Sequence, residues 1–137
     1  IAMLLLGVSL AVSAKPLGDD QILLEEAIQD VHVFYREGGI MSVIHQVDQC
    51  YKNSSVPKMY CFYMDYAGRI LDAQMIEALN AQSDSKFPTK KYFNDEQFYD
   101  RSYHYIYQSA EVSMDEANVH LRDLYVKIVD LLNEQFK

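Results

Sequence analysis

Apolar residues recur every three or four positions along most of the chain, which is the spacing of one face of an α-helix. The pattern predicts a first helix that is capped by Asp19 or Asp20 and ends near Arg36. The two glycines at 38–39 separate it from a second helix, predicted over residues 40–51. The amino-terminal part of the chain is therefore predicted to be a pair of helices joined at a glycine break.

The longest apolar face belongs to the predicted third helix. Pro57 suits the first turn of this helix, which we expect to run to about Ala81. Two adjacent stripes of apolar residues make it the helix expected to be most buried, and they comprise Cys61, Met64, Gly68, Leu71, Met75 and Leu79 together with Phe62, Tyr66, Ile70, Ala73 and Ile76. A break with one proline and three lysines follows over residues 83–93.

Two capping boxes predict the last two helices. Asn94 with Gln97 opens a fourth helix that reaches about Val112, and Ser113 with Glu116 opens a fifth. The apolar residues of the fifth helix are spaced by four and three, a pattern suited to packing in a bundle. No stretch alternates with period two in the manner of a strand. We therefore predict an all-α fold, a bundle of four to five helices.

The start of the chain is an uncharged apolar run that is too short to span a bilayer, which needs roughly 20 residues. The small residues Val12, Ser13 and Ala14 precede Lys15, as at a signal peptidase cleavage site. We interpret residues 1–14 as a secretory signal peptide truncated at its start. The alternative is an apolar core helix at the amino terminus.

Export of the chain defines the expected compartment and the state of its cysteines. Residues 15–137 are then a single helical domain, periplasmic or secreted, with no membrane span in the mature chain. Cys50 and Cys61 are the only cysteines and flank a run of helix-breaking residues at 53–57. In an oxidising compartment such a pair predicts a structural disulfide. On the loop-entropy account, closing a loop of this size stabilises the fold by about 3 kcal/mol.

Composition and charge exclude several classes of function. The 137 residues include 12 Lys+Arg against 20 Asp+Glu, a net charge of -8, which disfavours nucleic-acid binding. Four scattered histidines without a metal-binding motif lead us to expect no metal and no cofactor. Asp65 and Asp72 share a face of the third helix, and we interpret them as its polar edge rather than as a catalytic pair. We expect no enzymatic activity.

Tyrosine is the residue type that departs most from an ordinary composition. The chain has 11 tyrosines, and aromatic residues are concentrated between positions 92 and 107. Tyr99, Tyr103 and Tyr107 fall on one helical face, and tyrosine is enriched in protein interfaces. The alternative places these rings at the edge of the bundle with their hydroxyls in water. With the loop before them, the candidate binding residues are Phe87, Lys90, Tyr92, Tyr99, Tyr103 and Tyr107.

A leader, a small acidic helical domain and one disulfide resemble the periplasmic immunity proteins of bacterial type VI amidase effector systems. The segment with the closest likeness is CYKNSSVPKMYCFYMDYAGRILD, residues 50–72. The resemblance implies an immunity or inhibitor protein that binds a toxin or a cell-wall enzyme.

These features favour an exported, non-enzymatic binding protein that occludes a protein partner. The alternative is a small-molecule carrier or sensor with an apolar cavity inside the bundle, lined by Met64, Ile70, Met75 and tyrosines. A third interpretation is an enzyme that uses Asp65 or Asp72. A homodimer would use the same aromatic stripe as a protein partner.

Overall fold

The computed structural model describes residues 17–137, and the predicted signal peptide at 1–14 lies outside these residues. The described part of the chain contains helices and no strand, which confirms the predicted all-α fold with one disulfide. A short 3-10 helix (η1) and a π-helical turn (η2) accompany the α-helices. In chain order the elements are α1 (Gln21–Lys52), α2 (Lys58–Ala81), η1 (Lys91–Phe93), α3 (Asp95–Ser102), η2 (Tyr103–Tyr107), α4 (Gln108–Ala110) and α5 (Met114–Gln135).

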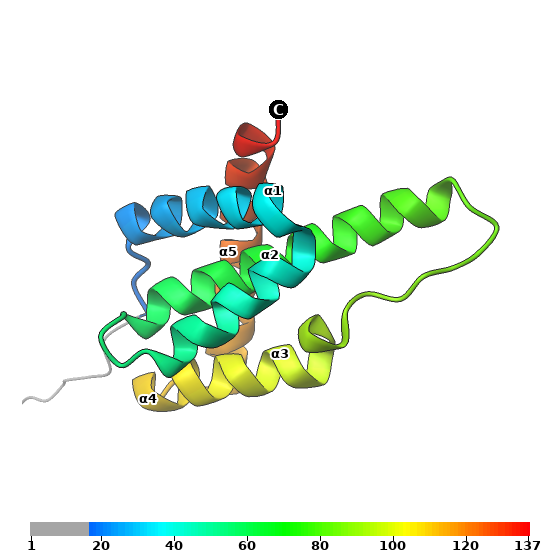
Figure 1. Cartoon of the computed structure of the whole chain (residues 1–137). Helices are drawn as coiled ribbons and strands as arrows, with labels where there is room; N and C mark the ends of the chain where they lie inside the picture. Colours follow the sequence, from blue (N-terminus) through cyan, green and yellow to red (C-terminus); the bar gives the residue numbers. More distant parts are fainter. Residues whose placement is uncertain (1–16) are drawn as a thin grey trace, which may run out of the picture.

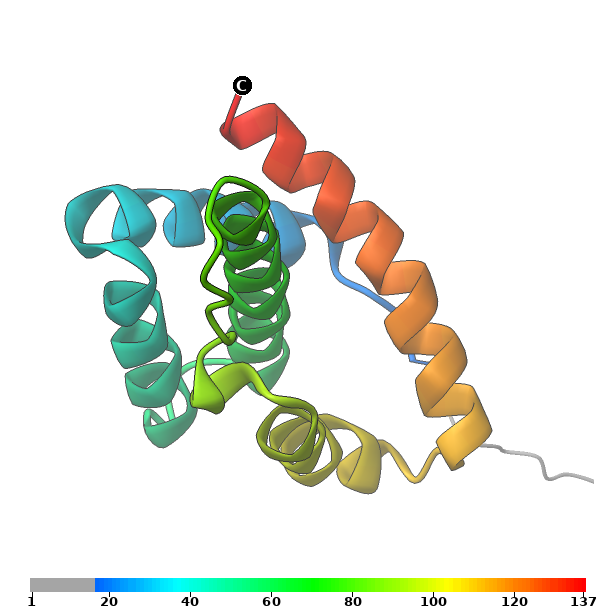
Figure 2. The same cartoon turned by 90° about the vertical axis from the view of Figure 1, so that its right-hand side faces the viewer.

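The central element of the fold is α2. Figure 2 shows it nearly end-on, with α1, α3 and α5 arranged around it. Between Cys61 and Asp72 every residue except Arg69 is buried, so this stretch of α2 packs on all sides. Gly68 allows the closest approach, because a Cβ built there would lie 2.7 Å from the Phe93 ring and 3.0 Å from Val43.

The long helix α1 consists of two helical segments separated at its glycine pair. Gly38 and Gly39 have non-helical backbone angles, and Gly39 has a φ of 73°, in the region that favours glycine. The chain bends sharply there, as Figure 1 shows. The predicted break between two amino-terminal helices is confirmed.

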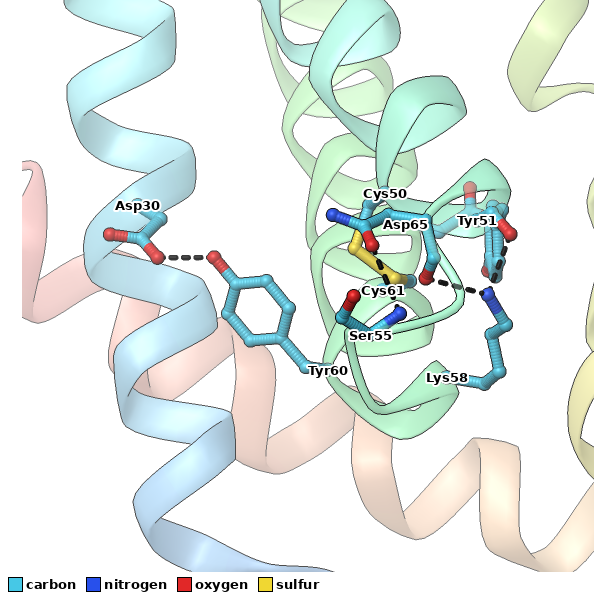
Figure 3. The surroundings of a disulfide bond; sticks show 9 residues. Asp30, Cys50, Tyr51, Ser55, Lys58, Tyr60, Cys61 and Asp65 are labelled. Atoms are coloured by element: carbon cyan, nitrogen blue, oxygen red, sulfur yellow. Dashed lines mark hydrogen bonds between the residues drawn. A yellow bond between two sulfur atoms is a disulfide. The ribbon is translucent and has the colours of Figure 1, made fainter.

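The disulfide fastens the end of α1 to the first turn of α2. Cys50 and Cys61 are bonded, with their Cα atoms 5.6 Å apart. Lys58 strengthens the same turn, since its ammonium group donates to the carbonyl oxygens of Tyr51 at 2.7 Å and Asn53 at 3.1 Å (Figure 3). The predicted disulfide and its place between two helices are therefore confirmed.

The predicted fourth helix is one helical path with an irregular turn. It runs from α3 through η2 into α4 and ends at Glu111, whose φ is 56°. The two predicted caps are present: the Asn94 side chain accepts from the Gln97 amide at 2.8 Å, and Ser113 accepts from the Glu116 amide at 3.1 Å. None of the helices within residues 17–137 is long and apolar enough to cross a membrane.

The end of α2 differs from the prediction. Burial stops at Asp72, and Met75 and Leu79 are 40% and 48% exposed, so the apolar face is not buried along the whole helix. Figure 1 shows this end of α2 extending beyond the other helices, with the following loop returning to α3. We call residues 73–90 the projecting arm. The prediction is wrong there because no other helix reaches far enough to cover this face.

Replacing Gly68 by alanine tests the close packing around α2. The new methyl group requires the Phe93 ring and Val43 to move, and we expect the free energy of unfolding to fall by about 1–3 kcal/mol. Gly18→Ala is the control, because a Cβ at Gly18 has no neighbour within 4 Å. Urea unfolding of both variants measures the difference, and equal stability contradicts the packing.

Candidate functional site

A buried ion pair holds α3 against α2. The guanidinium group of Arg101 donates to both oxygens of Asp65, at 2.8 Å each, and the Tyr51 hydroxyl donates to the same carboxylate at 2.8 Å. The Asp65 side chain is fully buried. Burial raises the pKa of Asp65, against the opposing effect of Arg101 and Tyr51. Because an unpaired buried charge is costly, this pair determines where α3 lies.

Tyr92 belongs to this interior cluster and not to the exposed aromatic stripe. The Arg101 guanidinium lies 3.7 Å from the centre of the Tyr92 ring, a cation–π contact. The Tyr92 hydroxyl is buried and has no hydrogen-bond partner among the described residues. Tyr92, one of the predicted binding residues, therefore packs against Arg101 in the interior.

The tyrosine stripe divides into an exposed part and a buried part. Tyr99 and Tyr103 are each 47% exposed, whereas Tyr107 is 2% exposed. The Tyr107 hydroxyl is bonded to the Nδ1 atom of His120 on α5, at 2.8 Å. Burial raises the pKa of Tyr107 well above that of a free tyrosine. Tyr99 and Tyr103 present their rings to solvent, and Tyr107 forms a fixed floor beneath them.

The three tyrosines line a hollow between α3–η2 and α5, and a second hollow adjoins it along α2. The first hollow, of about 260 Å³, lies among Tyr99, Ser102, Tyr103, Tyr107, Met114, Ala117, Asn118 and Leu121. The second hollow, also about 260 Å³, lies among Tyr66, Arg69, Ile70, Ala73, Gln74, Glu77, Phe98, Tyr99 and Tyr125. Tyr99 belongs to both, so the hollows adjoin. We call the two together the tyrosine groove.

The π-helical turn η2 forms one wall of the groove. It contains Tyr103 and Tyr107, and such turns are uncommon in helices and frequent at functional sites. A π-turn has more residues per turn than an α-helix, so it alters where the side chains after Tyr99 point. The sequence placed Tyr99, Tyr103 and Tyr107 on one face, and the structure brings all three to one hollow.

A chain of hydrogen bonds supports the floor of the groove. His120 Nε2 lies 2.8 Å from the Asp19 carboxylate, which can only accept, so His120 donates there and its Nδ1 accepts from Tyr107. Tyr63 also donates to Asp19, at 2.9 Å. Burial raises the pKa of Asp19, but the hydrogen bonds from His120 and Tyr63 outweigh it, and the net pKa is lowered. No sequence spacing indicated this chain, because its members lie on separate elements.

Phe87 and Lys90 lie on the projecting arm. They line a hollow of about 650 Å³ that also involves Ile76 and Leu79 of α2. The arm is held by Asn80, whose side-chain amide donates to the Phe87 carbonyl at 2.9 Å and accepts from the Phe87 amide at 2.7 Å. The loop is therefore an ordered part of the arm. Phe87 itself remains 44% exposed.

The paired carboxylates of α2 do not form its polar edge, contrary to the prediction. Asp65 and Asp72 are 0% and 2% exposed. Asp65 is bonded to Arg101 and Tyr51, and Asp72 accepts from the Lys90 backbone amide at 2.7 Å. Among the described residues, no hollow was found that both carboxylates line. Each carboxylate fastens a later segment of the chain to α2.

Two further expectations concern ligands. Within residues 17–137, no three His, Cys, Asp or Glu side chains lie close enough together to hold a metal ion. The alternative, a carrier or sensor, places Met64, Ile70 and Met75 around one apolar cavity, and in the structure these three residues have different surroundings. Ile70 lines the second hollow of the tyrosine groove, Met64 is 2% exposed within the core, and Met75 lies on the arm.

Comparison of the chain with profiles of known protein families, with characterised proteins and with solved structures found no significant match.

Replacing Arg101 by methionine tests the buried ion pair. We expect a loss of about 3–5 kcal/mol in the free energy of unfolding, because Asp65 stays buried without its partner. The double variant Asp65→Leu/Arg101→Met should recover much of this loss. Lys52→Met removes an exposed ion pair with Asp48 and should leave the denaturation midpoint unchanged. A double variant no more stable than Arg101→Met contradicts the charge-burial account.

The lowered pKa of Asp19 predicts a loss of stability in acid. Its pKa is lower in the folded chain than in the unfolded chain, where it is near 3.8, so the unfolded state takes up the proton first. Asp19 makes its full contribution to the free energy of unfolding above about pH 4. This contribution is lost as the pH falls through the lowered pKa of the folded state. The free energies of unfolding of wild type and Asp19→Asn, determined from pH 6 to pH 2, measure this contribution. The stability difference should shrink in acid for this variant and not for Asp130→Asn.

Proposed function

We propose that this chain is an exported, non-enzymatic binding protein that occludes a protein partner, such as a toxin or a cell-wall enzyme. The projecting arm carries the proposal. Residues 73–81 continue α2 for about 13 Å beyond the last buried residue, at 1.5 Å per residue. A helix end that leaves its own core and exposes apolar side chains is typical of a surface that another protein covers.

The arm has the features of an interface rather than of a solubilising loop. Met75, Leu79 and Phe87 expose large apolar surfaces, and three lysines lie close to them, at 86, 90 and 91. The Asn80 bonds hold the loop in one conformation, which lowers the entropy lost when a partner binds. An ordered, convex arm of this kind can fill a concave site and exclude substrate from it.

Export is supported by the disulfide and by the apolar leader in the sequence. Structural disulfides persist in oxidising compartments, and the Cys50–Cys61 bond ties the base of α2. The buried partners of Asp65 and Asp72 support a non-enzymatic role, because both carboxylates are bonded to protein groups.

Capture of the partner with arm variants tests the proposal. The exported chain is used as bait in the periplasmic or secreted fraction of its source, and a stoichiometric partner is identified by mass spectrometry. We expect Leu79→Asp to weaken capture at least tenfold, because a charge replaces an apolar contact on the arm. The activity of the captured protein, if it is a hydrolase, should fall when wild type is added and not when Leu79→Asp is added.

Val33→Asp is the matched control, since Val33 and Leu79 are both 48% exposed and Val33 lies on α1. It should retain the partner. Circular dichroism must show both variants folded. A partner that binds both variants equally, or one that keeps full activity in the complex, contradicts occlusion by the arm.

A further inference from the structure

We propose that the hollow on the projecting arm binds an acidic segment of the protein partner, whose carboxylates pair with Lys90 and Lys91 and whose apolar side chain enters the hollow. The inference deepens the proposed function and rests on it for the existence of a protein partner. We call this hollow, of about 650 Å³, the arm hollow. Its apolar lining, the two lysines in that lining and the bonds that hold them in place support the proposal.

The apolar lining of the arm hollow comes from both parts of the arm. Ile76 and Leu79 lie on the end of α2. Phe87 and Pro88 lie on the loop that returns to α3 (Figure 1). Leu79 and Phe87 are 48% and 44% exposed. An apolar side chain that enters the hollow removes part of both surfaces from water, which favours binding.

The charged residues in the lining are lysines. Lys90 and Lys91 line the arm hollow, and no acidic residue does. Neither ammonium group forms an ion pair with a carboxylate of residues 17–137, although the chain has 20 Asp+Glu against 12 Lys+Arg. A carboxylate that enters the hollow therefore meets two cations that lack an ionic partner within those residues. Complementary charge of this kind steers and orients a partner.

The acidic residues of the same region line other hollows. Asp72, Asp95 and Glu96 do so beside Arg69, and Glu77 does so in the tyrosine groove. Asp72 accepts from the Lys90 backbone amide, and Asp95 is bonded to Arg69 at 2.6 Å. Asp84, the other acidic residue of the arm, lines none of these hollows. The cationic lining therefore belongs to the surface that a segment in the arm hollow would contact.

Both lysines extend from a backbone that is held in place. The Lys90 amide donates to the buried Asp72 carboxylate at 2.7 Å, and Lys91 begins η1. Asn80 holds Phe87, on the loop, through two hydrogen bonds. A site formed before the ligand arrives loses little entropy on binding.

Selection from a library of random 12-residue peptides tests the proposal without any knowledge of the partner. Purified chain is the target, and enriched peptides are measured by titration at low and high salt. We expect peptides in which aspartate or glutamate flanks a leucine, isoleucine, methionine or phenylalanine, with an affinity that falls as salt rises. The double variant Lys90→Gln/Lys91→Gln should weaken these peptides at least tenfold.

The double variant Lys52→Gln/Lys137→Gln is the matched control, because it changes the net charge by the same amount. Lys52 lies beside the disulfide, at the other end of α2 from the arm, and Lys137 ends the chain. This variant should bind the acidic peptides within about twofold of wild type. Circular dichroism must show both double variants folded.

Four outcomes overturn the inference. They are no enrichment, enrichment of basic or uncharged peptides, acidic peptides that bind Lys90→Gln/Lys91→Gln as well as wild type, and binding to phosphatidylglycerol vesicles, but to no peptide, that this variant loses. The third outcome means adhesion elsewhere on the chain, and the fourth assigns the arm hollow to a lipid surface. A captured partner that Leu79→Asp loses and Lys90→Gln/Lys91→Gln retains at full affinity also overturns it, and leaves occlusion by the arm standing.

Discussion

The structure depends on the burial of the Asp65 carboxylate in the middle of its central helix. Asp65 has no exposed surface, and Arg101 and Tyr51 are the groups that satisfy it. Because Arg101 comes from α3, satisfying this charge fixes α3 against α2, and Tyr92 packs on the other side of the guanidinium. This contact helps to position the side chains of α3 beside α5, Tyr99 among them.

One helix supports both candidate surfaces. The 24 residues of α2 span about 36 Å, more than the surrounding helices cover, so its first part is core and its end is the arm. The second hollow of the tyrosine groove is lined in part by Ala73, Gln74 and Glu77 of the arm. The arm is convex and carries lysines, whereas the groove is concave and lined mainly by aromatic and apolar side chains.

The segment before α1 also supports the tyrosine groove. Asp19 precedes α1, yet it accepts hydrogen bonds from His120 on α5 and Tyr63 on α2. His120 in turn holds Tyr107, the floor of the groove. The segment that follows the predicted leader therefore stabilises a surface that it does not line.

The sequence by itself determined the helices, their caps, the break at Gly39 and the disulfide, because these depend on neighbouring residues and on backbone sterics. It also placed Tyr99 and Tyr103 on one face. Tertiary structure alone decided that Asp65 is buried, that Leu79 is exposed and that α5 closes the tyrosine groove. Helical periodicity shows which face of a helix is apolar, but it does not show whether another element is long enough to cover that face. Nor does it show which distant charge pairs with a buried one.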